Sequence, residues 1–123
     1  VHITDCGKMT PEALEWARQA DTLTIESNYD PEMLEKCHYT AVLQSRIRGG
    51  HGHMSNGECA EALKAVYHSG LKNIFLCHIS QNSNTPALAL ESAREALRSI
   101  GVDLGTVNLR TLKRGDYSPC VNL

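Results

Sequence analysis

Residues 73–79, Asn-Ile-Phe-Leu-Cys-His-Ile, constrain the fold more than any other segment of this chain. The run is nearly all apolar, which is typical of a β-strand that is covered on both faces. Residues 21–26 form a second β-type run, and alternating patterns at residues 1–4 and 106–112 predict strands near both ends of the sequence.

Five helices are predicted between these strands, each by a capping residue or an amphipathic pattern. Their expected starts are Thr10, Asp30, residue 41, Ser55 or Asn56, and Thr85. The third is expected to stop at Gly49, the fourth at Ser69-Gly70 and the last at Gly101. Because helices and strands alternate along the whole chain, the sequence predicts a layered α/β architecture, with residues 113–123 as a tail.

Charge and hydropathy exclude some classes of partner. Charged residues make up 21% of the chain and the formal net charge is −2, so the composition encodes no global attraction to nucleic acid or to an anionic membrane. No apolar run approaches the roughly 18 residues that a membrane-spanning helix needs. Residues 1–5 lack the basic and apolar order of a secretory signal, and we expect a cytoplasmic protein.

The five cysteines are irregularly spaced and form no C-x-x-C motif, which favours reduced thiols over a disulfide framework or a zinc ribbon. Cys59 and Cys77 are interpreted as small core residues, whereas Cys6 lies beside a candidate ligand. Residues 1–4 already read as a strand that runs into a turn at Asp5-Cys6-Gly7. We therefore expect the chain to be a fragment whose preceding half is missing.

Three polar side chains end β-type runs: Asp5, Glu26 and His78. In α/β layers, sites assemble at strand ends because the loops there converge on one crevice. Taken singly, each residue has a structural interpretation as well. Asp5 suits a turn, Glu26 a solvated strand end, and His78 a hydrogen-bonded core position.

His51 and His53 lie two residues apart in a glycine-rich loop, Gly49-Gly50-His51-Gly52-His53. The glycines allow close approach of the backbone and place no bulk beside the imidazoles. A loop with incidental histidines remains the structural alternative.

Together these motifs resemble the C-terminal half of a metallo-β-lactamase-fold hydrolase, in particular the YycJ/WalJ-like branch, which is related to tRNase Z and other nucleases. The resemblance extends from residue 1 to about residue 96. It is carried by residues 3–7 (ITDCG), 24–30 (TIESNYD), 46–47 (RI), 52–56 (GHMSN), 76–80 (LCHIS) and 82–86 (NSNTP). It implies that residues 1–112 are half of a four-layer αββα sandwich.

The resemblance also implies roles for individual residues. Asp5 matches an aspartate that bridges two metal ions, zinc or manganese, and His78 matches the last metal-binding histidine. His53 matches a histidine near the scissile phosphate, and Glu26 a glutamate that orients it. Ser80 and Asn82 are candidate substrate contacts, whereas Asn84 is interpreted as a helix cap.

Arg46 is a further candidate contact to phosphate, although the pattern favours a solvated position on an amphipathic helix. With its missing half, the protein is expected to hydrolyse nucleic acid with the help of metal ions, as a phosphodiesterase or exonuclease. His51 is expected to have no fixed role.

The sequence departs from the family in lacking the H-x-H-x-D-H signature that supplies most metal ligands. Two ligands do not complete a tetrahedral site, so the isolated chain is expected to bind metal weakly and to be inactive. One face of its sheet is expected to pair with the missing half or with another copy of the chain. Two alternatives remain: a hydrolase of esters, thioesters or lactones, and a non-catalytic α/β binding module.

Overall fold

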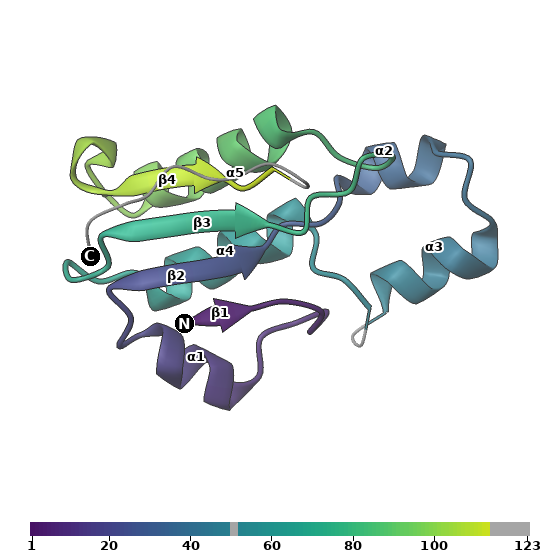
Figure 1. Cartoon of the computed structure of the whole chain (residues 1–123). Helices are drawn as coiled ribbons and strands as arrows, with labels where there is room; N and C mark the ends of the chain where they lie inside the picture. Colours follow the sequence, from purple (N-terminus) through teal and green to yellow (C-terminus); the bar gives the residue numbers. More distant parts are fainter. Residues whose placement is uncertain (50–51, 114–123) are drawn as a thin grey trace.

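A single parallel sheet organises the chain, whose computed structural model describes residues 1–49 and 52–113 (Figure 1). The spatial order of the strands follows their order in the sequence. The strands are β1 (His2–Ile3), β2 (Thr22–Glu26), β3 (Asn73–Cys77) and β4 (Asn108–Thr111). The expected α/β class is confirmed, and every crossover between parallel neighbours contains a helix, as this arrangement requires.

Helices begin where the sequence offers a capping side chain. The helices are α1 (Pro11–Ala17), α2 (Pro31–Lys36), α3 (Ala41–Arg48), α4 (Asn56–Val66) and α5 (Pro86–Ser99), with a short 3₁₀ helix, η1 (Leu104–Thr106). The caps of the five α-helices are Thr10, Asp30, Thr40, Ser55 and Thr85. Each cap accepts a hydrogen bond from the backbone N–H three residues further on, which satisfies one otherwise unpaired donor of the first turn.

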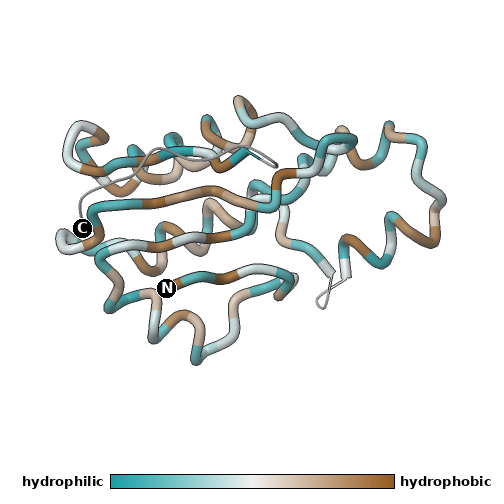
Figure 2. Tube along the Cα trace, in the orientation of Figure 1, coloured by the Kyte–Doolittle hydropathy of each residue, from teal (hydrophilic) through white to brown (hydrophobic). Residues whose placement is uncertain are grey.

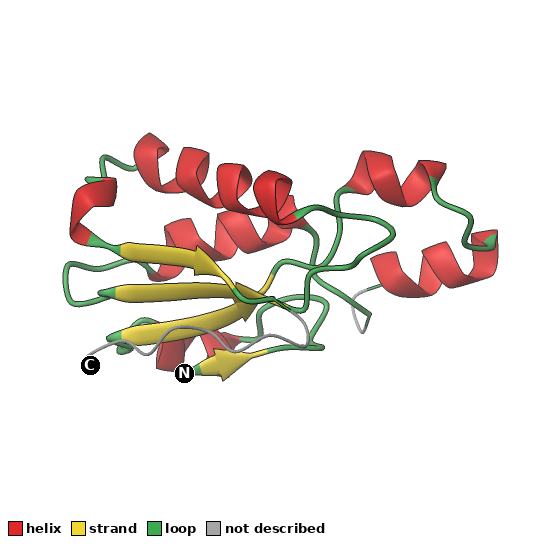
Figure 3. Cartoon of the chain, turned by 45° about the horizontal axis from the view of Figure 1, so that its top comes forward, coloured by secondary structure: helices red, strands yellow, loops and turns green. Residues whose placement is uncertain are grey.

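The hydrophobic core lies between the sheet and the helices α1, α4 and α5, which pack on one face of it (Figure 3). Alternate residues of β2 show this division, because Leu23 and Ile25 are fully buried whereas Thr22 and Thr24 are half-buried. Apolar residues concentrate along β3 (Figure 2), where Ile74 and Leu76 are buried and Phe75 is half-buried. Asn73 and Cys77, on the same face as Phe75, are also buried, so Phe75 alone departs from the predicted cover on both faces.

Several element boundaries differ from those predicted. The strand expected over residues 73–79 ends at Cys77, because His78 adopts a left-handed backbone with a φ of 56°. The last strand begins at Asn108 because residues 104–106 form the 3₁₀ turn, capped by Asp103. The helix expected to run to Ser69 ends at Val66, since Tyr67 already has an extended backbone.

Helices α2 and α3 extend away from the sheet (Figure 1), and we call residues 31–48 the α2–α3 excursion. Backbone hydrogen bonds join the two ends of this segment at its base. The N–H of Asn28 donates to the carbonyl of Met54 at 2.8 Å, and the N–H of Asn56 donates to the carbonyl of Tyr29 at 2.8 Å. The excursion is therefore anchored at the carboxyl end of β2, beside the start of α4.

No helix within residues 1–49 and 52–113 is long and apolar enough to cross a bilayer. The expected tail, residues 113–123, lies outside the described residues except for Lys113, and so does His51.

Candidate metal and catalytic site

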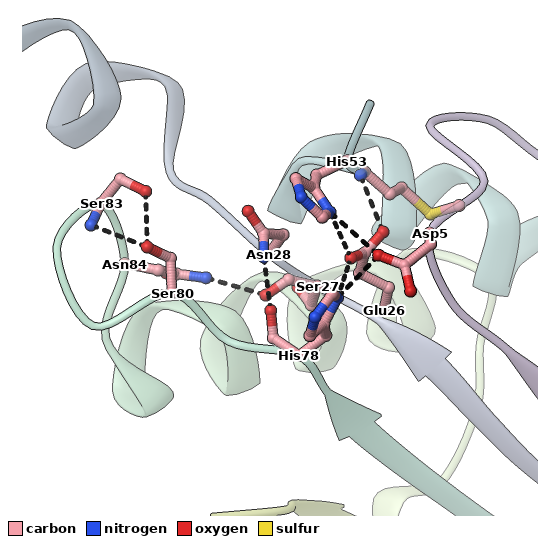
Figure 4. A network of polar contacts seen from close by, with 10 residues as sticks. Asp5, Glu26, Ser27, Asn28, His53, His78, Ser80, Ser83 and Asn84 are labelled. Carbon is pink, nitrogen blue, oxygen red and sulfur yellow. Dashed lines mark hydrogen bonds and ion pairs between the residues drawn. The ribbon is translucent and has the colours of Figure 1, made fainter. Parts of the chain in front are cut away.

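Polar side chains gather at the carboxyl ends of β1, β2 and β3 (Figure 4). Asp5 follows β1, Glu26 is the last residue of β2, and His78 directly follows β3. His53 comes from the connection between α3 and α4. Since parallel neighbours bring their carboxyl ends to one edge of the sheet, residues distant in sequence become neighbours there. The structure thus brings together the four residues that the sequence selected for metal binding and catalysis.

Glu26 is the central group of this cluster, and its side chain is fully buried. Its Oε1 lies 2.8 Å from Nδ1 of His53 and 2.5 Å from Nδ1 of His78, while its Oε2 accepts a hydrogen bond from the N–H of Met54 at 3.1 Å. Sequence reasoning paired Glu26 with His53 alone, because it had no means of placing β3 beside β2. A carboxylate that accepts from both Nδ1 atoms orients both rings and leaves their Nε2 atoms for other partners.

Asp5 is the accessible carboxylate of the site, with a side chain that is 63% exposed. Its Oδ1 lies 3.6 Å from Nδ1 of His53 and 3.4 Å from Nδ1 of His78. One potential ligand atom from each of the four residues lies within 4.8 Å of those of the other three. Carboxylate oxygen and imidazole nitrogen suit zinc and manganese, so this donor set fits the metal ions that the family resemblance implies.

Asp5 and His78 also share an unusual backbone. They have φ values of 55° and 56°, and within the described residues they alone combine a positive φ with a side chain. This conformation costs about 1–3 kcal/mol for such residues and persists only where the surroundings hold it. At His78 the carbonyl accepts a hydrogen bond from the side-chain amide of Asn28 at 2.6 Å. Backbone strain is often found at functional sites, so its presence at the two residues matched to metal ligands is consistent with such a site.

The end of α3 holds His53 in place. The N–H of His53 donates to the carbonyl of Ile47 at 2.9 Å, and the N–H of Gly52 donates to the carbonyl of Gly49 at 2.8 Å. A Cβ on Gly52 would lie 2.1 Å from the carbonyl oxygen of Arg46. The close backbone approach expected of the loop glycines is therefore real at Gly52, and it determines where His53 lies.

A buried polar network behind the site was not predicted. The Ser27 hydroxyl donates to Oδ1 of Asn56 at 2.7 Å, and Nδ2 of Asn84 donates to that same oxygen at 2.8 Å and to the carbonyl of Ser27 at 2.9 Å. Asn84 is thus not the cap of α5, a position that Thr85 occupies. The network joins the end of β2 to the starts of α4 and α5. Its only signal in the sequence is that these polar residues closely follow predicted strands or begin predicted helices.

The weaker substrate-contact candidates have different positions. The Ser80 hydroxyl accepts hydrogen bonds from the N–H groups of Asn82 and Ser83 and from the Ser83 hydroxyl, so it shapes its own loop. Nδ2 of Asn82 donates to the hydroxyl of Tyr39 at 2.9 Å. Arg46 is exposed on α3, and the α3 residue that lines the cavity beside the histidines is Ile47.

Two of the cavities near the strand ends differ in chemical character. A polar cavity of about 200 Å³ opens beside His53 and His78, between the α2–α3 excursion and the loop that follows β3. A larger cavity of about 390 Å³, between Met9 and α4, is lined mainly by apolar groups and contains none of the four clustered residues. The chemistry of the cluster therefore faces the smaller cavity.

None of the cysteines in residues 1–49 and 52–113 belongs to the cluster. Burial raises the pKa of Cys59 from 9.0 to about 12 and that of Cys77 to about 11. The pKa of Cys6 is raised by burial and then by the negative charge of Glu26. These three thiols are therefore protonated at neutral pH. Cys6, Cys37, Cys59 and Cys77 form no disulfide, as expected.

Comparison with known proteins agrees with the motifs. The chain is 32% identical over 103 residues to an exodeoxyribonuclease YycJ of Bacillus anthracis, an alignment that covers 84% of this chain and 39% of that protein. It is 33% identical over 107 residues to exodeoxyribonuclease WalJ from two strains of Streptococcus pneumoniae, covering 84% of this chain and 40% of those proteins. The predicted resemblance to the YycJ/WalJ branch is confirmed.

The chain spans about two fifths of the length of these relatives. No family model matches the chain, and neither does any solved structure. The described residues include a cluster of carboxylate and imidazole groups at the strand ends, the donor types that a metal-dependent hydrolase uses.

Proposed function

We propose that this chain is the C-terminal half of a metal-dependent nucleic-acid phosphodiesterase that acts as an exodeoxyribonuclease when complete. The observation that carries the proposal is the convergence of Asp5, Glu26, His53 and His78, whose potential ligand atoms lie within 4.8 Å of one another. Similarity to proteins named exodeoxyribonucleases supports the substrate class.

The open face of the sheet supports a proposed architecture for the complete domain. Described helices cover one face, and the half-buried residues Thr22, Thr24 and Phe75 lie on the other. In this proposal, residues 1–112 form half of a four-layer αββα sandwich, and the open face packs against a preceding sheet or, in its absence, against another copy of the chain. That preceding half carries the H-x-H-x-D-H ligands, and the assembled protein is cytoplasmic.

Asp5 and His78 are the groups of this chain that would hold two divalent ions, zinc or manganese. Glu26 is less available, because both of its oxygens already accept hydrogen bonds inside the fold. When bound, the ions lower the pKa of a water molecule so that it becomes a nucleophile near neutral pH. With the remaining ligands absent, the isolated chain binds metal weakly and does not turn over.

His53 has a separate task in this proposal. Glu26 accepts the hydrogen on Nδ1 of His53, and the N–H of His53 anchors the residue to Ile47. An imidazole held in this way presents its Nε2 to the substrate, where it stabilises charge on a phosphate oxygen or protonates the leaving oxygen. Glu26 is the positioning residue, and by contacting His78 as well it couples the metal ligand to the proton donor.

Cleavage of end-labelled DNA and RNA by the full-length protein, with manganese, zinc and magnesium in turn, tests the proposal. We expect metal-dependent release of nucleotides from DNA ends, with a loss of at least about 100-fold in His53→Ala, in the range typical of general acid–base catalysis.

His68→Ala is the matched control. The His68 imidazole bonds to the Ala20 carbonyl and the Gly70 N–H, near the amino end of β3 and away from the site. This variant should lose stability but keep kcat. If several metals and nucleic acids give no cleavage, the nuclease assignment is wrong, and hydrolysis of a thioester or lactone would then assign a different substrate class.

A further inference from the structure

The polar cavity beside the histidine pair has a lining that the proposed reaction does not yet use. His53 and His78 form its inner wall. The outer wall comes from the α2–α3 excursion, through Tyr39 and Ile47, and residues 80–82 of the loop after β3 lie opposite. Any group held in this cavity therefore lies beside the side chains that would act on the scissile phosphodiester.

The chemistry of the lining selects the kind of group that fits. Apart from the two histidines, every described residue of the lining has an uncharged side chain, and three of these are the amides of Asn28, Gln81 and Asn82. Such a lining does not suit a phosphate or a carboxylate, which proteins bind with arginine, lysine or clustered backbone N–H groups. Amides both donate and accept hydrogen bonds, so they suit a neutral group with mixed donors and acceptors, such as any nucleobase.

The volume of the cavity further restricts which ligands fit. The cavity volume of about 200 Å³ is below the roughly 300–1,000 Å³ of sites that enclose drug-sized ligands. It has room for one base and not for a base pair, so the terminal nucleotide must be unpaired to enter.

Tyr39 is the aromatic residue of the lining, and its position is secured from both sides. Its hydroxyl accepts a hydrogen bond from Nδ2 of Asn82 at 2.9 Å, which joins the excursion to the loop after β3. Its carbonyl accepts from Nε2 of Gln44 at 3.0 Å. An aromatic ring beside amide groups provides stacking for a base of any sequence.

We infer that this cavity binds the unpaired terminal nucleobase of a DNA strand, with Tyr39 as its stacking residue and Asn82 holding Tyr39 in place. This inference rests on the proposed nuclease function and adds to it a preference for single-stranded ends. The excursion thereby determines which ends of DNA reach the histidines.

Binding of two small probes to the full-length protein tests the cavity without any turnover. Calorimetry compares deoxyadenosine 5′-monophosphate with 2-deoxyribose 5-phosphate, which lacks only the base. We expect the nucleotide to bind more tightly, by about 5-fold to 150-fold, the range that stacking of one base supplies. Tyr39→Ala should abolish this advantage and leave the affinity for the sugar phosphate within twofold.

Two further variants separate stacking from a general loss of structure. Tyr39→Phe keeps the ring and should retain most of the base preference, and Asn82→Ala should weaken it less than Tyr39→Ala does. Trp16→Ala truncates an aromatic side chain that is 65% exposed on α1 and should change neither affinity. Equal affinity of the wild-type protein for the two probes, or an equal loss for both in Tyr39→Ala, overturns the inference.

Cleavage then separates this inference from the nuclease assignment. Against single-stranded DNA with a normal terminal nucleotide, Tyr39→Ala should raise KM by the same factor, whereas with an abasic terminal nucleotide it should match the wild-type protein. If the protein binds the base through Tyr39 but cleaves no DNA, the inference about the cavity stands and the nuclease assignment is wrong. If the protein cleaves normal and abasic ends equally well, the nuclease assignment stands and the inference about the cavity is wrong.

Discussion

Gly52→Ala should inactivate the protein, although it adds a single methyl group at a residue that takes no part in the proposed reaction. The new Cβ would lie 2.1 Å from the carbonyl oxygen of Arg46 and 2.6 Å from that of Ile47, where ordinary contact begins at 3.4 Å. The end of α3 and the chain at Gly52 must therefore move apart by about 1.3 Å. That shift breaks the hydrogen bond from the N–H of His53 to Ile47, which is now 2.9 Å long.

The expected losses follow from this displacement. A misplacement of about 1 Å at a catalytic group costs about 100-fold in rate, so kcat should fall by that order. Overpacking and the lost hydrogen bond should lower the free energy of unfolding by about 2–4 kcal/mol. Metal-dependent cleavage of end-labelled DNA by the full-length protein and urea denaturation measure the two effects.

Gly57→Ala is the matched control, five residues along the same segment. The nearest atom to a Cβ on Gly57 is the Ser55 hydroxyl at 3.9 Å, and Gly57 lies in the first turn of α4. Alanine is the better helix former, so this variant should keep its activity and be stabilised by up to about 1 kcal/mol. If Gly52→Ala retains activity within threefold of wild type, the contact with α3 does not position His53.

Three further predictions concern buried polar groups. Glu26→Gln should reduce activity by about 10–100-fold, because an amide cannot accept from both histidines and from the Met54 N–H at once; retention within threefold would contradict this. Asn84→Ala should lower the free energy of unfolding by about 1–3 kcal/mol in urea denaturation, since it leaves buried partners unpaired, and a change below about 0.5 kcal/mol would disprove it. Because burial raises the pKa of Cys59 to about 12, its thiol stays protonated in the fold while it ionises in the unfolded chain above pH 9.0. The free energy of unfolding should therefore fall by about 2 kcal/mol by about pH 10.5, and this part of the pH dependence should be absent in Cys59→Ala.

Local patterns were sufficient to predict most helix starts and the side chains that meet at the strand ends. The helix starts at Thr10, Asp30, Ser55 and Thr85 were predictable because a cap acts within its own turn. Three polar side chains at strand ends were recognisable because parallel strands present these ends together.

Contacts that depend on lateral strand order could not be read from the sequence. Nothing local to Glu26 indicates that one of its oxygens lies against two histidines, because that requires β3 beside β2 and the α3–α4 connection above both. The left-handed backbones of Asp5 and His78 are equally invisible, since they depend on the packing around them. The role of Asn84 was misassigned because capping and network positions call for the same residue type.

The backbone hydrogen bonds at the base of the α2–α3 excursion allow most of its length to change without moving the strand ends. Asn28 and Tyr29 are joined to residues 54–56, so the two ends of the excursion meet whatever lies between them. Lengthening a loop whose ends are already closed costs little, about 0.6 kcal/mol for each doubling. The part of the excursion before Arg46 can thus change in length at little cost while Asp5, Glu26 and His78 remain in place. The carbonyls of Arg46 and Ile47 must keep their positions, because they determine where His53 lies.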